Sequence, residues 1–223
     1  MGEQIQITAE DGFQFDAYRA MPDDEPAGAI VVVQEIFGVN QHIREVSDGF
    51  AAEGYVAIAP AIFDRAERGV ELGYEPDDMT RGIEIVSREL DHNAIMFDLQ
   101  ASIDEARQFG KVGVVGYCFG GTMAWLCACR ARGLACAVGY YGGQIAQNAA
   151  LTPQVPVMLH FGELDAHIPM DDVNRIKEAH PDIPVYVYKA DHGFNCDHRA
   201  SYDEAASKEA RDRTLDFFST NLA

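Results

Sequence analysis

The chain has 223 residues, 48% of them apolar, and a formal net charge of −19. This length and composition favour one domain over residues 1–223, with a substantial core, and exclude a disordered chain. The acid excess repels nucleic acid and anionic membrane surfaces, so neither is an expected partner. The apolar runs are too short to span a membrane, and the first residues do not have the pattern of a secretory signal.

An odd number of cysteines without regular spacing argues against a disulfide framework. They are Cys118, Cys127, Cys129, Cys136 and Cys196. With no secretory signal visible, we expect reduced thiols and a cytoplasmic protein.

In the first part of the chain, Ile5–Ile7 and Phe13–Tyr18 alternate apolar and polar residues on either side of a turn, which predicts an antiparallel hairpin. Ala29–Val33 and Tyr55–Pro60 are continuous apolar runs, typical of strands covered on both faces. A helix that ends at Gly54 separates them.

Ala61–Asp78 follows as a charged, irregular segment, longer than most loops in compact domains, and we expect it to be functional. Helices are predicted next around Met79–Leu90 and Ala94–Phe109.

The second half of the chain continues the alternation of strands and helices. Strands are predicted at Lys111–Gly116, Cys136–Tyr141, Val157–Phe161 and Val185–Tyr188, and a closing helix at Ala205–Phe218. This order predicts an α/β fold with a mostly parallel central sheet and helices on both faces.

A Gly-x-Cys-x-Gly sequence links the strand that ends at Gly116 to the helix through Met123–Leu126. This is the pattern of a nucleophile elbow, with Cys118 in place of the usual serine. Gly116 and Gly120 would let the backbones on either side of the turn approach closely, and the helix N-terminus favours a thiolate. Taken alone, the motif also fits a glycine-rich turn with a buried structural cysteine.

Polar residues follow two later strands, at the edge of the sheet where ligands bind in parallel α/β folds. Asp165 comes after the Val157 strand and His192 after the Val185 strand. The order of nucleophile, acid and base is that of the α/β-hydrolases, so we predict a triad. Glu163 and Asp191 are neighbouring acids that compete with Asp165 for the orienting role.

Each of these residues also has a plainer interpretation. Asp165 could cap the helix that begins near Pro169, and His192 could be a surface residue. The other six histidines are poorer candidates for the base. They lie in helices, in loops or inside a strand, or follow Asp165 too closely in sequence to be placed independently of it. A metal site from His192, Cys196 and His198 is conceivable, but the spacing matches no strong zinc pattern. We expect neither a metal nor another cofactor.

On these residues the chain resembles the dienelactone hydrolases (carboxymethylenebutenolidases), from the first hairpin to the closing helix. The matching segments are Gln34–Asn40, Gly116–Gly121, Gly139–Gly142, Gly162–Asp165 and His192–Phe194. The resemblance implies an α/β-hydrolase fold and a Cys118–His192–Asp165 triad. The triad would open a lactone ester through an acyl-cysteine, with dienelactone going to maleylacetate in aromatic degradation.

The resemblance also implies roles for residues around the nucleophile. Glu35 would contact the resting thiol and help to convert it to thiolate when substrate enters. The backbone N–H groups of Ile36 and Phe119 would form the oxyanion hole, and Phe37 would contribute to the substrate site.

The chain departs from the family at the two arginines that hold the substrate carboxylate. Arg81 matches the first, but Cys196 occupies the position of the second, and Arg199 is the nearest replacement. A different ester, lactone or thioester is therefore the alternative substrate, and a non-catalytic binding protein is a third possibility. We expect a small-molecule substrate and a monomer or small homo-oligomer.

Overall fold

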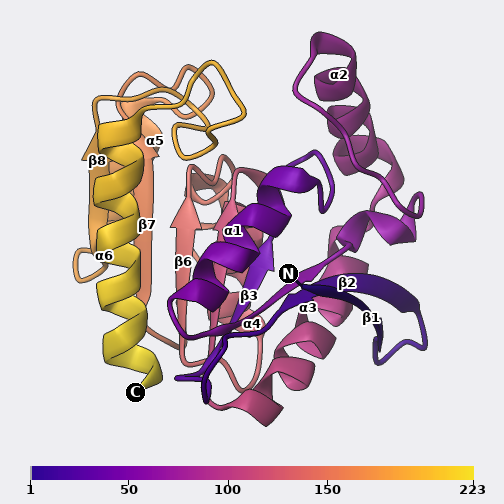
Figure 1. The fold of residues 1–223 in the computed structure, drawn as a ribbon. Coiled ribbons are helices and arrows are strands. Elements are labelled where there is room, and N and C mark those ends of the chain that lie inside the picture. The colour runs from indigo at the N-terminus through magenta and orange to yellow at the C-terminus, as the bar shows by residue number, and fades with distance from the viewer. Residues whose placement is uncertain (1) are drawn as a thin grey trace.

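The computed structural model describes residues 2–223 and contains one eight-stranded sheet in the order β1-β2-β4-β3-β5-β6-β7-β8 (Figure 1). The strands are β1 (Glu3–Thr8), β2 (Gln14–Ala20), β3 (Ala29–Val33), β4 (Val56–Pro60), β5 (Val112–Tyr117), β6 (Cys136–Tyr140), β7 (Val157–Gly162) and β8 (Val185–Tyr188). β2 is antiparallel to both of its neighbours, β1 and β4. The remaining neighbours, from β4 through β3 to β5, β6, β7 and β8, all pair in parallel. The predicted hairpin and mostly parallel sheet are therefore confirmed.

Helices cover both faces of this sheet, as predicted. They are α1 (Gln41–Ala52), α2 (Pro76–Glu84), α3 (His92–Ala106), α4 (Phe119–Arg130), α5 (Met170–Ala179) and α6 (Glu204–Leu222). α1 and α6 lie on the face toward the viewer in Figure 1, and α3 and α4 lie on the opposite face. Every residue of β3, β4, β5 and β6 is buried, because both faces of these central strands are covered. Among residues 2–223, every helix is too short or too polar to traverse a lipid bilayer.

The charged segment Ala61–Asp78 has more structure than predicted. It begins with a short 3₁₀ helix at Ile62–Arg65, and an isolated bridge pairs Glu71 with Gly38. The bridge ties the segment to the turn that follows β3, so the segment runs beside the ends of the central strands.

The helix predicted around Met79–Leu90 consists of α2 followed by one turn of π-helix at Ile85–Glu89. Figure 1 shows α2 projecting beyond the body of the sheet. At Gly82 the helix backbone lies so close to the turn after β3 that an added Cβ would be 2.1 Å from the carbonyl oxygen of Ile36. This contact fixes α2 over the edge of the sheet where the predicted catalytic residues lie.

The turn between β5 and α4 is the sharpest feature at this edge. Cys118 has φ of 54° and ψ of −115°, a strained conformation for a residue with a side chain. A Cβ at Gly116 would be 1.9 Å from the carbonyl oxygen of Gly120, and a Cβ at Gly120 would be 2.3 Å from that of Val33. Glycine is therefore required at both positions, and the close packing presses the start of α4 against the end of β3.

Candidate active site

The ends of three parallel strands bring Cys118, Asp165 and His192 together. Cys118 follows β5, Asp165 follows β7 and His192 follows β8. The Nε2 atom of His192 lies 3.1 Å from the Sγ atom of Cys118. On the other side of the ring, Nδ1 lies 2.7 Å from the Oδ2 atom of Asp165. The three side chains thus form a continuous hydrogen-bonded chain that can move a proton to or from the sulfur.

Asp165 is held in place by its own backbone. Its Oδ1 atom accepts hydrogen bonds from the N–H groups of His167 at 2.8 Å and Ile168 at 3.2 Å. The carboxylate therefore caps a turn with one oxygen and leaves Oδ2 for the imidazole. Of the competing acids, Glu163 is exposed, and Asp191 accepts a hydrogen bond from the backbone N–H of His192. Of these three acids, therefore, Asp165 is the one whose carboxylate bonds to the ring of His192.

The groups that bond to His192 favour the protonated form of its ring. Burial alone would lower the pKa of His192, but its hydrogen bonds to Asp165 and Cys118 raise that pKa to about 10. Burial is the largest influence on the pKa of Asp165 and would raise it, but the hydrogen bond and the charge of His192, together with the backbone N–H of His167, outweigh burial and lower this pKa. At neutral pH the ring is a cation between a carboxylate and the sulfur.

A cavity of about 250 Å³ opens over the sulfur of Cys118. One wall is apolar and comes from Met79 and Ile83 of α2 and Val86 of the π-helix. This wall is a feature that the sequence reasoning missed. Met79, Ile83 and Val86 are spaced by four and three residues and so share a face of the helix, a pattern that could have revealed it. The predicted substrate residue Phe37 also lines the cavity.

The two residues expected to form the oxyanion hole both line this cavity. Phe119 is the first residue of α4, so its N–H group has no acceptor within the helix. Ile36 belongs to the turn after β3, which the close approach of Gly120 to Val33 brings beside the start of α4. Their role as donors stays a prediction.

Glu35 and Arg199 form an ion pair beside the cavity. Glu35 is only 1% exposed, and its Oε1 atom accepts a hydrogen bond of 3.2 Å from Nη1 of Arg199. Its Oε2 atom is buried without a hydrogen-bond partner among residues 2–223. The Arg199 guanidinium also lies over the rings of Phe37 and Tyr74, at 5.7 and 6.0 Å from their centroids. Within the described chain, therefore, the carboxylate of Glu35 bonds to Arg199 and the sulfur of Cys118 to His192. The contact expected between Glu35 and the resting thiol stays a prediction.

Arg81 is not among the residues that line the cavity. Its guanidinium pairs with Glu67 at 2.8 Å and Glu84 at 3.2 Å, and also with Glu89. Three carboxylates already occupy its donors, so the predicted role of Arg81 in substrate binding would require some of these pairs to open.

The conceivable metal site from His192, Cys196 and His198 is not assembled in residues 2–223, where His192 bonds to Cys118 and Asp165. Cys196, at the position of the missing family arginine, is buried, and burial raises its pKa to about 12.

Comparison with known proteins points to one family. A model of the dienelactone hydrolase family matches residues 15–222. The carboxymethylenebutenolidase of Pseudomonas putida is 35% identical over 96% of this chain and 95% of its own length. Carboxymethylenebutenolidase 1 of Cupriavidus pinatubonensis is 32% identical over 97% and 96%. A solved Klebsiella pneumoniae chain, provisionally described as a dienelactone hydrolase, superposes with a TM-score of 0.85 at 32% identity and covers 98% of each chain.

Replacing Asp165 with asparagine should shift the pH dependence of hydrolysis. Asp165→Asn removes a negative charge that raises the pKa of His192, so the alkaline limb of kcat/KM should move to lower pH. We expect kcat for p-nitrophenyl acetate to fall by about 10²–10⁴-fold.

Asp191→Asn is the matched control for this measurement, because Asp191 bonds to the backbone of His192 and not to its ring. It should leave the alkaline limb in place. An equal shift in both variants would show that Asp165 has no special role.

Proposed function

The chain belongs to the dienelactone hydrolase family and is a carboxylic ester hydrolase, and from this premise we propose that it opens a lactone through an acyl-cysteine, with dienelactone going to maleylacetate. One observation carries the proposal. The ring of His192 lies 3.1 Å from the sulfur of Cys118 and 2.7 Å from the carboxylate of Asp165.

The first half of the proposed reaction makes the acyl-enzyme. The sulfur of Cys118, as thiolate, attacks the lactone carbonyl carbon, and the N–H groups of Ile36 and Phe119 stabilise the charge on the carbonyl oxygen. The carbonyl then re-forms and the ring C–O bond breaks. The leaving enolate oxygen takes the Nε2 proton of His192, which leaves a neutral imidazole and an acyl-cysteine.

The second half restores the enzyme. Water attacks the acyl carbon while the neutral ring of His192 accepts one of its protons. The C–S bond breaks and releases the product as a carboxylic acid, which loses its proton to solvent, so that thiolate and imidazolium stand paired again. Asp165 keeps Nδ1 of the ring in place during both proton transfers.

Arg199 and Glu35 give this reaction a means of recognising an anionic substrate. We propose that the substrate carboxylate bonds to Arg199 in competition with Glu35, which loosens the ion pair. As the resemblance implies, Glu35 would keep Cys118 as a thiol until substrate enters. The released carboxylate would then take the proton of that thiol, which leaves a thiolate paired with His192, and would return the proton after product leaves. The single 3.2 Å bond of Glu35 to Arg199 and its unpartnered Oε2 atom support an exchangeable pair.

A less anionic ester is the second candidate substrate. Cys196 stands where the family has an arginine, and among the described residues that line the cavity Arg199 is the single arginine. The apolar wall from Met79, Ile83 and Val86 also suits an uncharged acyl or alcohol group.

We also propose a cytoplasmic location for this enzyme. All five cysteines are free thiols, the state that a reducing compartment maintains.

The direct test of this function is turnover of cis- and trans-dienelactone by wild type and Cys118→Ala. We expect the variant to lose about 10³-fold or more of kcat, because the nucleophile is gone. Cys129→Ala, which removes a half-buried thiol from α4, the helix that begins after Cys118, should retain wild-type turnover. Equal rates in wild type and Cys118→Ala would refute an acyl-cysteine.

The role of Arg199 can be tested by comparing substrates. Arg199→Gln should raise KM for dienelactone roughly 10–100-fold and leave KM for a neutral ester such as p-nitrophenyl acetate within a few-fold, because only dienelactone presents a carboxylate. Arg199→Lys keeps the charge and should recover part of the loss.

Arg175→Gln, at an exposed residue of α5, is the control for loss of a positive charge that does not line the cavity. If wild type prefers neutral esters and Arg199→Gln affects both substrates equally, the less anionic substrate class is the correct one.

A further inference from the structure

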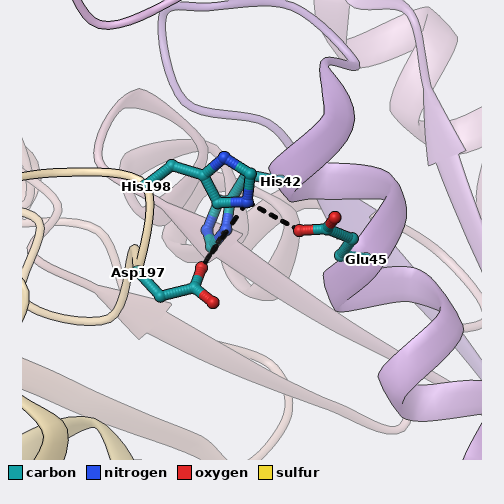
Figure 2. A group of neighbouring side chains, drawn as sticks. All are labelled: His42, Glu45, Asp197 and His198. Carbon is teal, nitrogen blue, oxygen red and sulfur yellow. Dashed lines mark hydrogen bonds and ion pairs between the residues drawn. The ribbon is translucent and has the colours of Figure 1, made fainter.

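Four side chains from two distant segments meet beside the N-terminal part of α1 (Figure 2). His42 and Glu45 lie three residues apart on α1 and so share one face of the helix. Asp197 and His198 are neighbours in the loop between β8 and α6. One nitrogen or oxygen atom from each of the four side chains lies within 4.8 Å of the other three.

The imidazole of His42 needs a partner that the rest of the protein does not supply. His42 is 2% exposed, and neither of its ring nitrogens has a hydrogen-bond partner among residues 2–223. Nδ1 lies 3.3 Å from an oxygen of Asp197 without the geometry of a hydrogen bond. A buried nitrogen without a partner costs free energy, and a bound cation would give one of the two nitrogens a partner.

We propose that His42, Glu45, Asp197 and His198 bind a divalent transition-metal ion, for which zinc is the best match. Two neutral imidazoles and two carboxylates carry a charge that balances a divalent cation. The ion would take the place of the proton in the 2.7 Å hydrogen bond between Nε2 of His198 and Oε2 of Glu45.

The donor atoms and their spacing favour zinc over calcium or magnesium. Imidazole nitrogens suit zinc and its neighbours in the transition series, whereas calcium and magnesium bind oxygen. In a zinc tetrahedron with bonds of about 2.1 Å the ligand atoms are roughly 3.4 Å apart. Three of the separations, 2.7, 3.3 and 3.8 Å, bracket this value, and all of the donor atoms lie within 4.8 Å of one another, so side-chain movements would complete the site.

An ion can reach this position from outside. A cavity of about 220 Å³ borders His42, Glu45 and Asp197, and all of the four except His42 are partly exposed. The net charge of −19 also raises the local concentration of cations.

A metal ion here would connect α1 to the loop that follows β8. That loop carries His192 and Arg199, which is the residue after His198. The ion would therefore hold the positions of the catalytic base and of the arginine at the cavity, although it lies outside the cavity itself. An ion that binds the folded protein and not the unfolded chain must also raise the thermal stability of the protein.

The test begins with titration of chelator-treated protein with Co²⁺, because the absorption spectrum of bound Co²⁺ reports which atoms bind it. A thermal melt with and without Zn²⁺ follows. Wild type should bind one Co²⁺ per chain with visible bands of a tetrahedral site and no sulfur-to-cobalt band in the near ultraviolet. Zn²⁺ should raise the Tm, and Ca²⁺ should not. His198→Ala and Glu45→Gln should each weaken Co²⁺ binding at least tenfold, and both change exposed side chains that the fold does not need.

Two controls separate this site from others. Glu53→Gln removes another acid near the end of α1, which pairs with Arg211, and should bind Co²⁺ as wild type does. Cys118→Ala should also bind normally, so the result does not depend on the proposed catalytic mechanism. The proposal is overturned if wild type binds no Co²⁺ at millimolar concentration, or if His198→Ala binds as tightly as wild type. A sulfur-to-cobalt band would overturn it too, because it would assign the ion to Cys118 or to the buried group of Glu35, His42 and Cys196.

Discussion

The position of one imidazole ring determines what this protein can do. His192 lies between a buried carboxylate and a sulfur, and its hydrogen bonds to both outweigh the effect of burial and raise its pKa to about 10. The ring is therefore a proton donor at neutral pH and can stabilise a negative charge on Cys118. Without Asp165, one of the two partners that raise this pKa would be lost, and burial would favour the neutral ring more strongly. The proposed activation of Cys118 would then be lost too.

The fold delivers the three groups to this point through its backbone. Parallel strands end at the same edge of the sheet, so residues that follow β5, β7 and β8 converge there. The approach of Gly116 to Gly120 is too close for any side chain, so glycine here permits the turn that holds Cys118 at positive φ. The same packing sets the start of α4 beside the turn after β3, where Ile36 lies. The proposed triad and the expected oxyanion hole thus depend on the same backbone contact.

The sequence predicted the fold and the three converging residues because both depend on local patterns: continuous apolar strands, a glycine-bounded cysteine and polar residues at strand ends. It could not predict pairings made only in the folded chain. Arg81 matches the family by position, but three glutamates surround it. Arg199 bonds to Glu35, 164 residues away in sequence. Neither His42 nor His198 directly follows a predicted strand. The sequence pattern therefore could not show that they meet Glu45 and Asp197, and only the tertiary structure does.

The protonation state of His192 tests the central claim most directly. In ¹⁵N-labelled wild-type protein, both ring nitrogens of His192 should carry a proton at pH 8 and titrate with a pKa of about 10. In Cys118→Ala the pKa should fall, because one of the two interactions that raise it is lost. A His192 ring that is neutral at pH 7 in wild type, with the same pKa in the variant, would contradict the account.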